Sequence, residues 1–122
     1  MPAKKRGRSR INPELASRIL RTVPVTEAFH FSTDIGQYTG EFATSLTDFF
    51  EKSKKIALKS IEFHFKRGDF ERWIRETIGD ENLANRIIAI DGSIKGENLR
   101  KTIQRRVKRR LNYLKSTIRT ET

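Results

Sequence analysis

The sequence predicts a mainly α-helical fold: a small compact domain of about five helices with a short β-hairpin near residues 28–43, a basic N-terminal arm and a long basic C-terminal helix. Three observations lead to this prediction. A chain of 122 residues suits one small domain with tails. After residue 44, capping residues and apolar residues at helical spacing recur along the chain. Residues 28–43 differ, because they hold two glycines and three β-branched residues.

The N-terminal end combines an arm and a short helix. Residues 1–10 have no apolar periodicity, so we expect a disordered arm when the protein is free. Asn12 and Pro13 then resemble an N-cap followed by proline at the first helical position. The helix covers residues 13–22, and Thr22-Val23-Pro24 ends it.

The segment AFHFS alternates between apolar and polar residues and predicts a short strand. GQYTG reads as a turn or loop, after which EFA pairs back to form the hairpin.

Four helices are expected to follow. Thr44-Ser45 caps the first and Gly68 ends the second. Asp69 and Asp80 are then expected to cap the third and fourth. The helices cover residues 45–56, 57–67, 69–78 and 81–90.

The last segment, Glu97 to Arg119, is the clearest helix. Its apolar residues fall on one stripe at 100° per residue: Leu99, Ile103, Val107, Leu111, Leu114 and Ile118. The cations on the opposite side are Lys101, Arg105, Lys108, Arg109 and Arg119. Arg106 and Arg110 lie at the edge of the stripe, where their stems can pack while their guanidinium heads reach water.

The formal charge of +11 is concentrated at the two ends of the chain. Residues 1–10 carry five basic residues and no acidic one, and residues 97–122 carry nine basic residues against Glu97 and Glu121. Residues 11–96 are close to neutral. This pattern predicts a disordered basic arm (1–10), a compact near-neutral domain (11–96) and a basic helix (97–122) that packs on it. Basic ends of this kind most often meet a polyanion.

Each of the two histidines stands between phenylalanines, in FHF at His30 and again at His64. Because the first triplet is expected on a strand and the second on a helix, we predict neither a duplication nor a preformed histidine pair. His64 is expected to be buried and bonded to a backbone carbonyl or to Asp69. With Phe63 and Phe65 about 200° apart on a helix, one should pack inwards and the other at a boundary.

An enzyme needs a site, and the sequence offers none. There is no cysteine, no P-loop, no GxSxG and no HExxH. The acidic residues between 69 and 81 are explained by caps and by pairs with neighbouring arginines. We therefore expect a non-catalytic protein without a cofactor, a metal site or an evident small-molecule substrate.

Nucleic acid is the partner that the basic ends predict. Cations held on a rigid helix contact phosphates, and counterion release drives the binding. Arginine also favours bidentate phosphate contacts. A solvated helix face is the ordinary alternative, but it would carry interspersed acids. The candidate residues are Lys4, Lys5, Arg6, Arg8, Arg10, Lys101, Arg105, Arg106, Lys108, Arg109, Arg110 and Lys115.

Ribosomal RNA is favoured over DNA, because basic extensions around a compact neutral body are typical of ribosome-associated proteins. A chromatin-type DNA-binding protein is one alternative, and a protein-interaction module with solubilising basic tails is another. No apolar run reaches about 20 residues, so no membrane span is expected. The basic, amphipathic C-terminal helix makes binding to a membrane surface a further alternative. A membrane partner is nevertheless not expected, because the apolar face of this helix holds Leu, Ile and Val without Trp or Phe and has a domain to pack on. The basic start also lacks the apolar region of a secretory signal, so a cytoplasmic protein is expected.

The middle of the chain carries a series of short motifs in order: Ser45-Leu46, Phe63-His64, Gly68-Asp69-Phe70, Trp73-Ile74, Gly79-Asp80 and Leu83-Ala84. With these motifs, residues 28–90 resemble a small uncharacterised domain of unknown function found chiefly in archaea and some bacteria. The resemblance implies that the body is one unit, but it implies no activity. The two basic ends lie outside it, so we expect the function to reside there.

Overall fold

The computed structural model describes residues 11–119, which form six α-helices, a 3₁₀-helix, a π-helix and a hairpin. The elements are α2 (Pro13–Ile19), η1 (Val25–Glu27), β1 (Phe29–Ser32), β2 (Tyr38–Ala43), α3 (Leu46–Ser53), α4 (Leu58–Arg67), α5 (Asp69–Arg72), η2 (Trp73–Ile78), α6 (Glu81–Ile88) and α7 (Gly96–Arg119). The predicted mainly α-helical fold with a hairpin and a long C-terminal helix is confirmed. The predicted arm, residues 1–10, lies outside the described residues.

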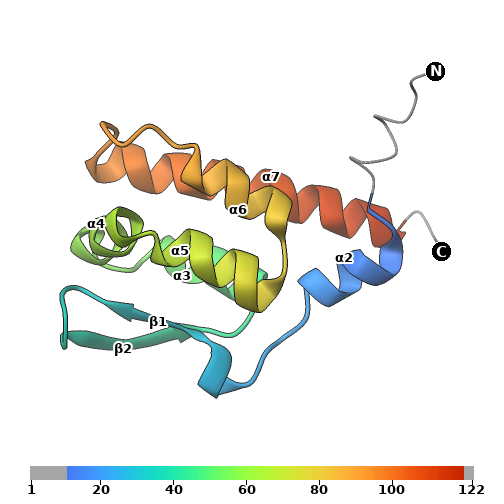
Figure 1. Cartoon of the computed structure of the whole chain (residues 1–122), viewed down its shortest axis with the longest axis horizontal. Coiled ribbons are helices and arrows are strands. Elements are labelled where there is room, and N and C mark those ends of the chain that lie inside the picture. Colours follow the sequence, from blue (N-terminus) through green and yellow to red (C-terminus); the bar gives the residue numbers. More distant parts are fainter. Residues whose placement is uncertain (1–10, 120–122) are drawn as a thin grey trace.

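The helices α3, α4 and α5 lie between α7 and the hairpin (Figure 1). The long helix α7 contacts α2, α3, α4 and α6. On the other side, β1 packs against α4 and β2 packs against α3. The basic helix and the hairpin therefore occupy opposite sides of the molecule.

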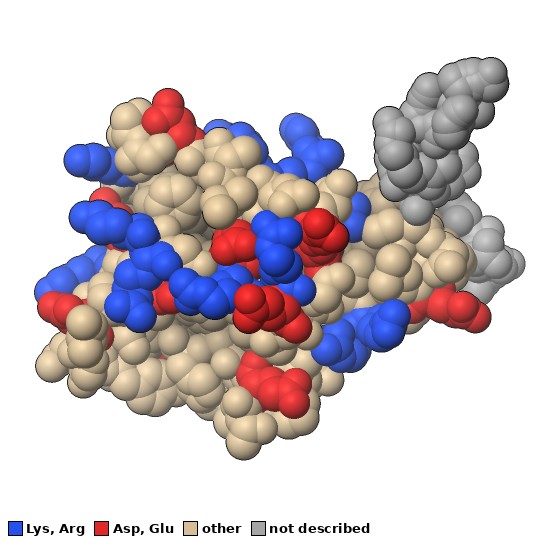
Figure 2. Space-filling view, in the orientation of Figure 1, with Lys and Arg blue, Asp and Glu red and all other residues tan. Residues whose placement is uncertain are grey.

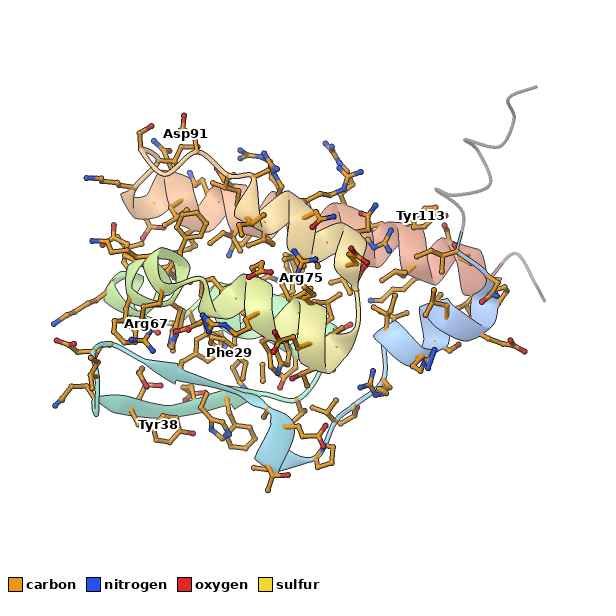
Figure 3. All side chains as sticks on the ribbon, in the orientation of Figure 1. Phe29, Tyr38, Arg67, Arg75, Asp91 and Tyr113 are labelled. Atoms are coloured by element: carbon orange, nitrogen blue, oxygen red, sulfur yellow. The ribbon has the colours of Figure 1, made fainter. Side chains whose placement is uncertain are left out.

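An aromatic cluster joins the hairpin to the helices. Phe29 lies beneath α5 (Figure 3), and its ring centroid is 5.1 Å from that of Phe70 and 5.6 Å from that of Trp73. The Trp73 Nε1–H donates to the Glu27 carbonyl oxygen at 2.9 Å, so the indole ring is packed in the core and its N–H has a hydrogen-bond partner. Phe31 and Phe49 are fully buried in the same core. These contacts fix the hairpin against α5 and η2.

The capping residues act largely as the sequence predicts. The side chain of Asn12 accepts from the Leu15 N–H and begins α2, with Pro13 at its first position. Ser45 caps α3 by accepting from Asp48 N–H, and Asp80 caps α6 by accepting from Leu83 N–H. Each side chain satisfies a backbone donor that the first helical turn leaves unpaired.

The turn of the hairpin lies earlier than predicted. It spans residues 33–37, where the Thr33 N–H donates to the Gln37 carbonyl oxygen at 3.0 Å. Thr39 and Gly40, which were expected in the turn, belong to β2, where the strand register is irregular opposite Phe31. Gly40 has φ 91°, a conformation that suits glycine in such a bulge.

The predicted role of Asp69 as a helix cap is wrong. Gly68 occupies the junction between α4 and α5 in the left-handed conformation, with φ 76°. The Asp69 carboxylate is instead engaged by the side chains of His64, Arg67 and Arg72. The predicted helix 69–78 is present as α5 followed by the π-helix η2.

The expected division of Phe63 and Phe65 is confirmed in part, because Phe65 packs against the hydrophobic core, but neither ring is fully buried. Both phenylalanines are half-buried, and the residue of this triplet that is buried is His64, at 5% exposure. In the first triplet, the predicted alternation is confirmed, because Phe29 and Phe31 are buried and His30 is exposed.

Candidate nucleic-acid interface

The basic helix α7 begins at Gly96, which has φ 64° and donates its backbone N–H to the Glu62 carboxylate at 2.9 Å. Its predicted apolar stripe faces the body: Leu99, Ile103, Val107, Leu111 and Leu114 are buried, and Ile118 is partly buried. Burial of this stripe holds the opposite face of α7 outward and gives its cations a rigid support.

The outward face of α7 carries an excess of positive charge. Five of the predicted residues are exposed there: Lys101, Arg105, Lys108, Arg109 and Lys115. None of them forms a salt bridge with Asp or Glu between residues 11 and 119. Arg109 forms no hydrogen bond with the described residues either.

The face of the body over α4 and α5 differs from α7 in its charge. Figure 2 shows basic and acidic side chains side by side over α4 and α5. There Arg67 and Arg72 pair with Asp69, and Arg75 pairs with Glu71 at 2.6 Å. These three arginines therefore have acidic partners, whereas the five exposed candidate cations of α7 form no salt bridge with a described acid.

A hollow of about 560 Å³ lies between α6 and α7. Its lining is Asn82, Arg86, Arg105, Arg106, Arg109, Arg110 and Tyr113. Two hydrogen bonds order its arginines: Arg86 Nε donates to Asn82 Oδ1 at 3.0 Å, and Arg106 Nη1 donates to the Arg86 carbonyl oxygen at 2.9 Å. No carboxylate belongs to the described lining, so the hollow is strongly cationic.

A second hollow flanks α7 on the side of α3. Lys108 Nζ lies 5.5 Å from the ring centroid of Phe50, and Arg105 and Arg109 border both hollows. The outward face of α7 is thus a ridge between two concave strips, each with cations along it.

Arg110 departs from the prediction that its guanidinium head reaches water. It is 7% exposed, and it forms a two-point ion pair with Asp80 through Nε–Oδ2 at 2.8 Å and Nη2–Oδ1 at 2.9 Å. Because both hydrogen bonds are buried, this arginine ties α7 to the start of α6 and is not presented to a ligand as the other cations are.

Arg86 is a candidate residue that the sequence prediction missed. It is exposed on α6, twenty residues from the Arg106 side chain that bonds its carbonyl. Only the packing of α6 against α7 brings it to the basic helix. The local signal was weak, because a single arginine on the polar side of a short helix is ordinary.

The N-terminal end of the described chain contacts α7 at Tyr113. The Ile11 N–H donates to the Tyr113 hydroxyl oxygen at 3.4 Å, and α2 packs against α7. Figure 3 shows Tyr113 on α7 beside the start of α2. The candidate arm residues Lys4, Lys5, Arg6, Arg8 and Arg10 lie outside the described residues, but the chain that carries them enters the fold at this point.

The two histidines have separate structural settings. His64 accepts a hydrogen bond at Nε2 from the Ser32 N–H at 2.8 Å, and its Nδ1 lies 2.9 Å from Asp69 Oδ2. Asp69 is one of the two hydrogen-bond partners that the sequence predicted for His64. His30 instead contacts the Tyr38 hydroxyl and the Val25 carbonyl oxygen.

Burial and hydrogen bonding together set the ionisation of the His64–Asp69 pair. It lowers the pKa of His64 by disfavouring the imidazolium, and the bond to Asp69 opposes this effect without reversing it. Burial raises the pKa of Asp69, but hydrogen bonds from His64 and Arg67 outweigh it, and the net pKa lies below its usual value. His64 is therefore a neutral imidazole whose Nδ1–H donates to a carboxylate.

Between residues 11 and 119, no three histidine or acidic side chains lie together in a way that could hold a metal ion. A further hollow of about 610 Å³ lies among α4, α5 and the segment that joins α6 to α7, and its floor includes Phe65, Ile87 and Leu99. Its border mixes both signs of charge and includes none of the predicted site residues.

None of the helices in the described part of the chain combines the length and the apolar character that crossing a membrane requires. In comparisons with protein-family models, with curated proteins and with solved structures, nothing matches the chain. The resemblance of residues 28–90 to a domain of unknown function thus stays a prediction.

Proposed function

We propose that the protein binds nucleic acid without catalysing a reaction, and that it contacts the phosphate backbone through α7 and the N-terminal arm. The observation that carries the proposal is a set of exposed cations on a rigid helix that form no salt bridge with a described acid, whereas Arg67, Arg72 and Arg75 on α4, α5 and η2 are paired with acids. Phosphates provide the counter-charge that these cations lack.

The position of Ile11 also supports the proposal. Because residue 11 lies against Tyr113 on α7, the five cations of residues 1–10 are attached next to the basic helix. Arm and helix can then contact one stretch of backbone. Binding of this kind depends on phosphates and on shape, since the chain offers few groups that read base edges.

RNA is the favoured ligand, and the ribosome is the favoured location. Basic extensions on a compact near-neutral body suit a protein that fits between RNA helices, and such a partner would place the protein in the cytoplasm. DNA is the alternative ligand. Sedimentation of cell extract through sucrose, with and without ribonuclease, separates the two: co-migration with ribosomal particles supports RNA, and recovery with DNA alone contradicts it.

Fluorescence anisotropy with a labelled RNA duplex tests binding directly. If each basic region neutralises three or four phosphates, the logarithm of affinity should fall against the logarithm of salt concentration with a slope of about −6. A DNA duplex of the same sequence serves as the second ligand. An affinity that does not change with salt would refute the proposal.

A further inference from the structure

The hollow between α6 and α7 carries more positive charge than contact with the middle of a nucleic-acid strand requires. Four arginines line it, three from α7 and one from α6: Arg86, Arg105, Arg106 and Arg109. Arg110 also lines it, but Asp80 neutralises that guanidinium. Four like charges around one concave site repel one another, and a multiply charged anion would relieve this repulsion.

Three of the four arginines are held by hydrogen bonds before any ligand arrives. Asn82 orients Arg86 through its Nε, and the Arg86 carbonyl orients Arg106 through one Nη1 bond. Arg105 donates to the Thr102 hydroxyl at 3.3 Å. Each of these guanidinium groups keeps other N–H donors, and a planar guanidinium can donate two parallel bonds to one phosphate. Because part of the ordering cost is already met, phosphate binding here should be favourable.

The shape of the site favours the end of a chain over its middle. A phosphodiester inside a duplex carries a single charge and lies on a convex surface. A terminal phosphate monoester carries a charge of about −1.5 to −2 at neutral pH, with three oxygens that can accept hydrogen bonds. A terminal group can also enter a hollow, whose volume of about 560 Å³ lies within the range of small-ligand sites.

We infer that the α6–α7 hollow binds the terminal phosphate of a nucleic-acid strand. This inference rests on the proposed function and names a chemical group that the same surface would prefer. Free polyphosphate has the same chemistry, so the experiment must separate a strand end from a free anion.

The test compares three RNAs of one sequence, carrying a 5′-phosphate, a 3′-phosphate or hydroxyl groups at both ends. We expect at least one phosphorylated RNA to bind about tenfold more tightly than the hydroxyl RNA, the gain of one charged, hydrogen-bonded contact. Arg86→Gln should abolish this preference, since Arg86 belongs to the hollow but not to the outward face of α7. Its thermal stability should match the wild type because the side chain is exposed.

Lys101→Gln is the matched control, because Lys101 is exposed on α7 and does not line this hollow. This variant should weaken the binding of all three RNAs by the same factor and leave the preference for the phosphorylated end intact. Equal, salt-dependent binding of the three RNAs by the wild-type protein would overturn the inference while leaving the proposed function in place.

Tripolyphosphate serves as the probe for a free anion. Competition that removes the preference for the phosphorylated end, but leaves binding of the hydroxyl RNA, supports the inference. If no RNA binds at all, the proposed function fails. Binding of tripolyphosphate that Arg86→Gln eliminates would then assign the hollow to a free anion, which overturns the inference about strand ends.

Discussion

Arg110 of α7 and Asp80 at the start of α6 form a buried ion pair with two hydrogen bonds, at 2.8 and 2.9 Å. The Asp80 carboxylate also accepts from Leu83 N–H and so caps α6. One carboxylate therefore begins a helix and anchors a second one. The neighbouring cation Arg109 has an exposed side chain, so adjacent arginines in the same basic run have different roles.

The first prediction concerns the stability that this pair provides. Arg110→Met should lower the free energy of unfolding by about 3–5 kcal/mol, because it leaves the Asp80 charge buried without its partner. Arg109→Met changes the same charge at an exposed position and should cost less than about 0.5 kcal/mol. Urea denaturation followed by circular dichroism measures both values.

The double variant Asp80→Asn, Arg110→Met tests the cause. Asparagine can still cap α6, and no unpaired charge remains in the interior. We expect it to recover a large part of the loss seen for Arg110→Met. If the double variant is as unstable as the single one, the loss comes from packing of the arginine stem and not from the stranded carboxylate.

This pair also marks the limit of what the sequence could predict. The stripe from Leu99 to Leu114 follows from periodicity alone, and caps such as Ser45 follow from residue type, so both were predictable. Arg110 sits at the edge of that stripe like Arg106, and periodicity cannot tell which edge residue meets an acid from another helix. Its partner lies thirty residues away, so the ion pair depends on how α6 packs against α7.

Packing also explains why the sequence prediction missed Arg86, and a local turn explains why it assigned the wrong role to Asp69. The contribution of Arg86 to the hollow requires two helices to be side by side, which local sequence does not encode. Asp69 follows a glycine that ends a helix, as a capping residue often does. The left-handed Gly68 instead turns the chain so that the Asp69 carboxylate meets His64, and the cap pattern alone gave the wrong role.

The second prediction is a loss of stability at mildly acidic pH that depends on His64. Its folded-state pKa lies below the value of about 6.5 that it has when unfolded. Above pH 7 both states hold a neutral imidazole. As pH falls through about 6.5, the unfolded chain takes up a proton that the native state resists, so the free energy of unfolding should fall by at most about 1.4 kcal/mol per pH unit.

Two variants assign this effect to one histidine. His64→Leu should remove its share of the pH dependence and cost about 1–3 kcal/mol at pH 7.5, since the Ser32 N–H loses its acceptor. His30→Gln should keep the dependence, because His30 is exposed on the hairpin. Denaturation curves between pH 5.5 and 7.5 provide the measurement. An unchanged slope in His64→Leu would exclude His64 as its source.

The third prediction separates a localised interface from the effect of net charge. Replacing Lys101, Arg105 and Lys108 with glutamine should make the salt slope of RNA binding shallower by about 0.9 for each phosphate that is no longer neutralised, from about −6 to about −3. Replacing Lys59, Lys66 and Lys95 removes the same charge from exposed sites that precede α7 in the chain. Anisotropy titrations should show the slope preserved in this second variant. Equal changes of slope in both would mean that overall charge, and not α7, determines binding.

The fourth prediction concerns the left-handed junction at Gly68. Alanine there should cost about 1–2 kcal/mol, because its Cβ disfavours the observed φ of 76°. A clash is not the cause, since the nearest atom to that Cβ would be Arg72 Nη2 at 3.8 Å, an ordinary contact. Gly92→Ala is the control, because Gly92 has no positive φ and open space around it. It should leave stability unchanged or raise it by less than about 1 kcal/mol. If urea denaturation gives equal values for the two variants, the left-handed conformation of Gly68 does not disfavour a side chain at this position.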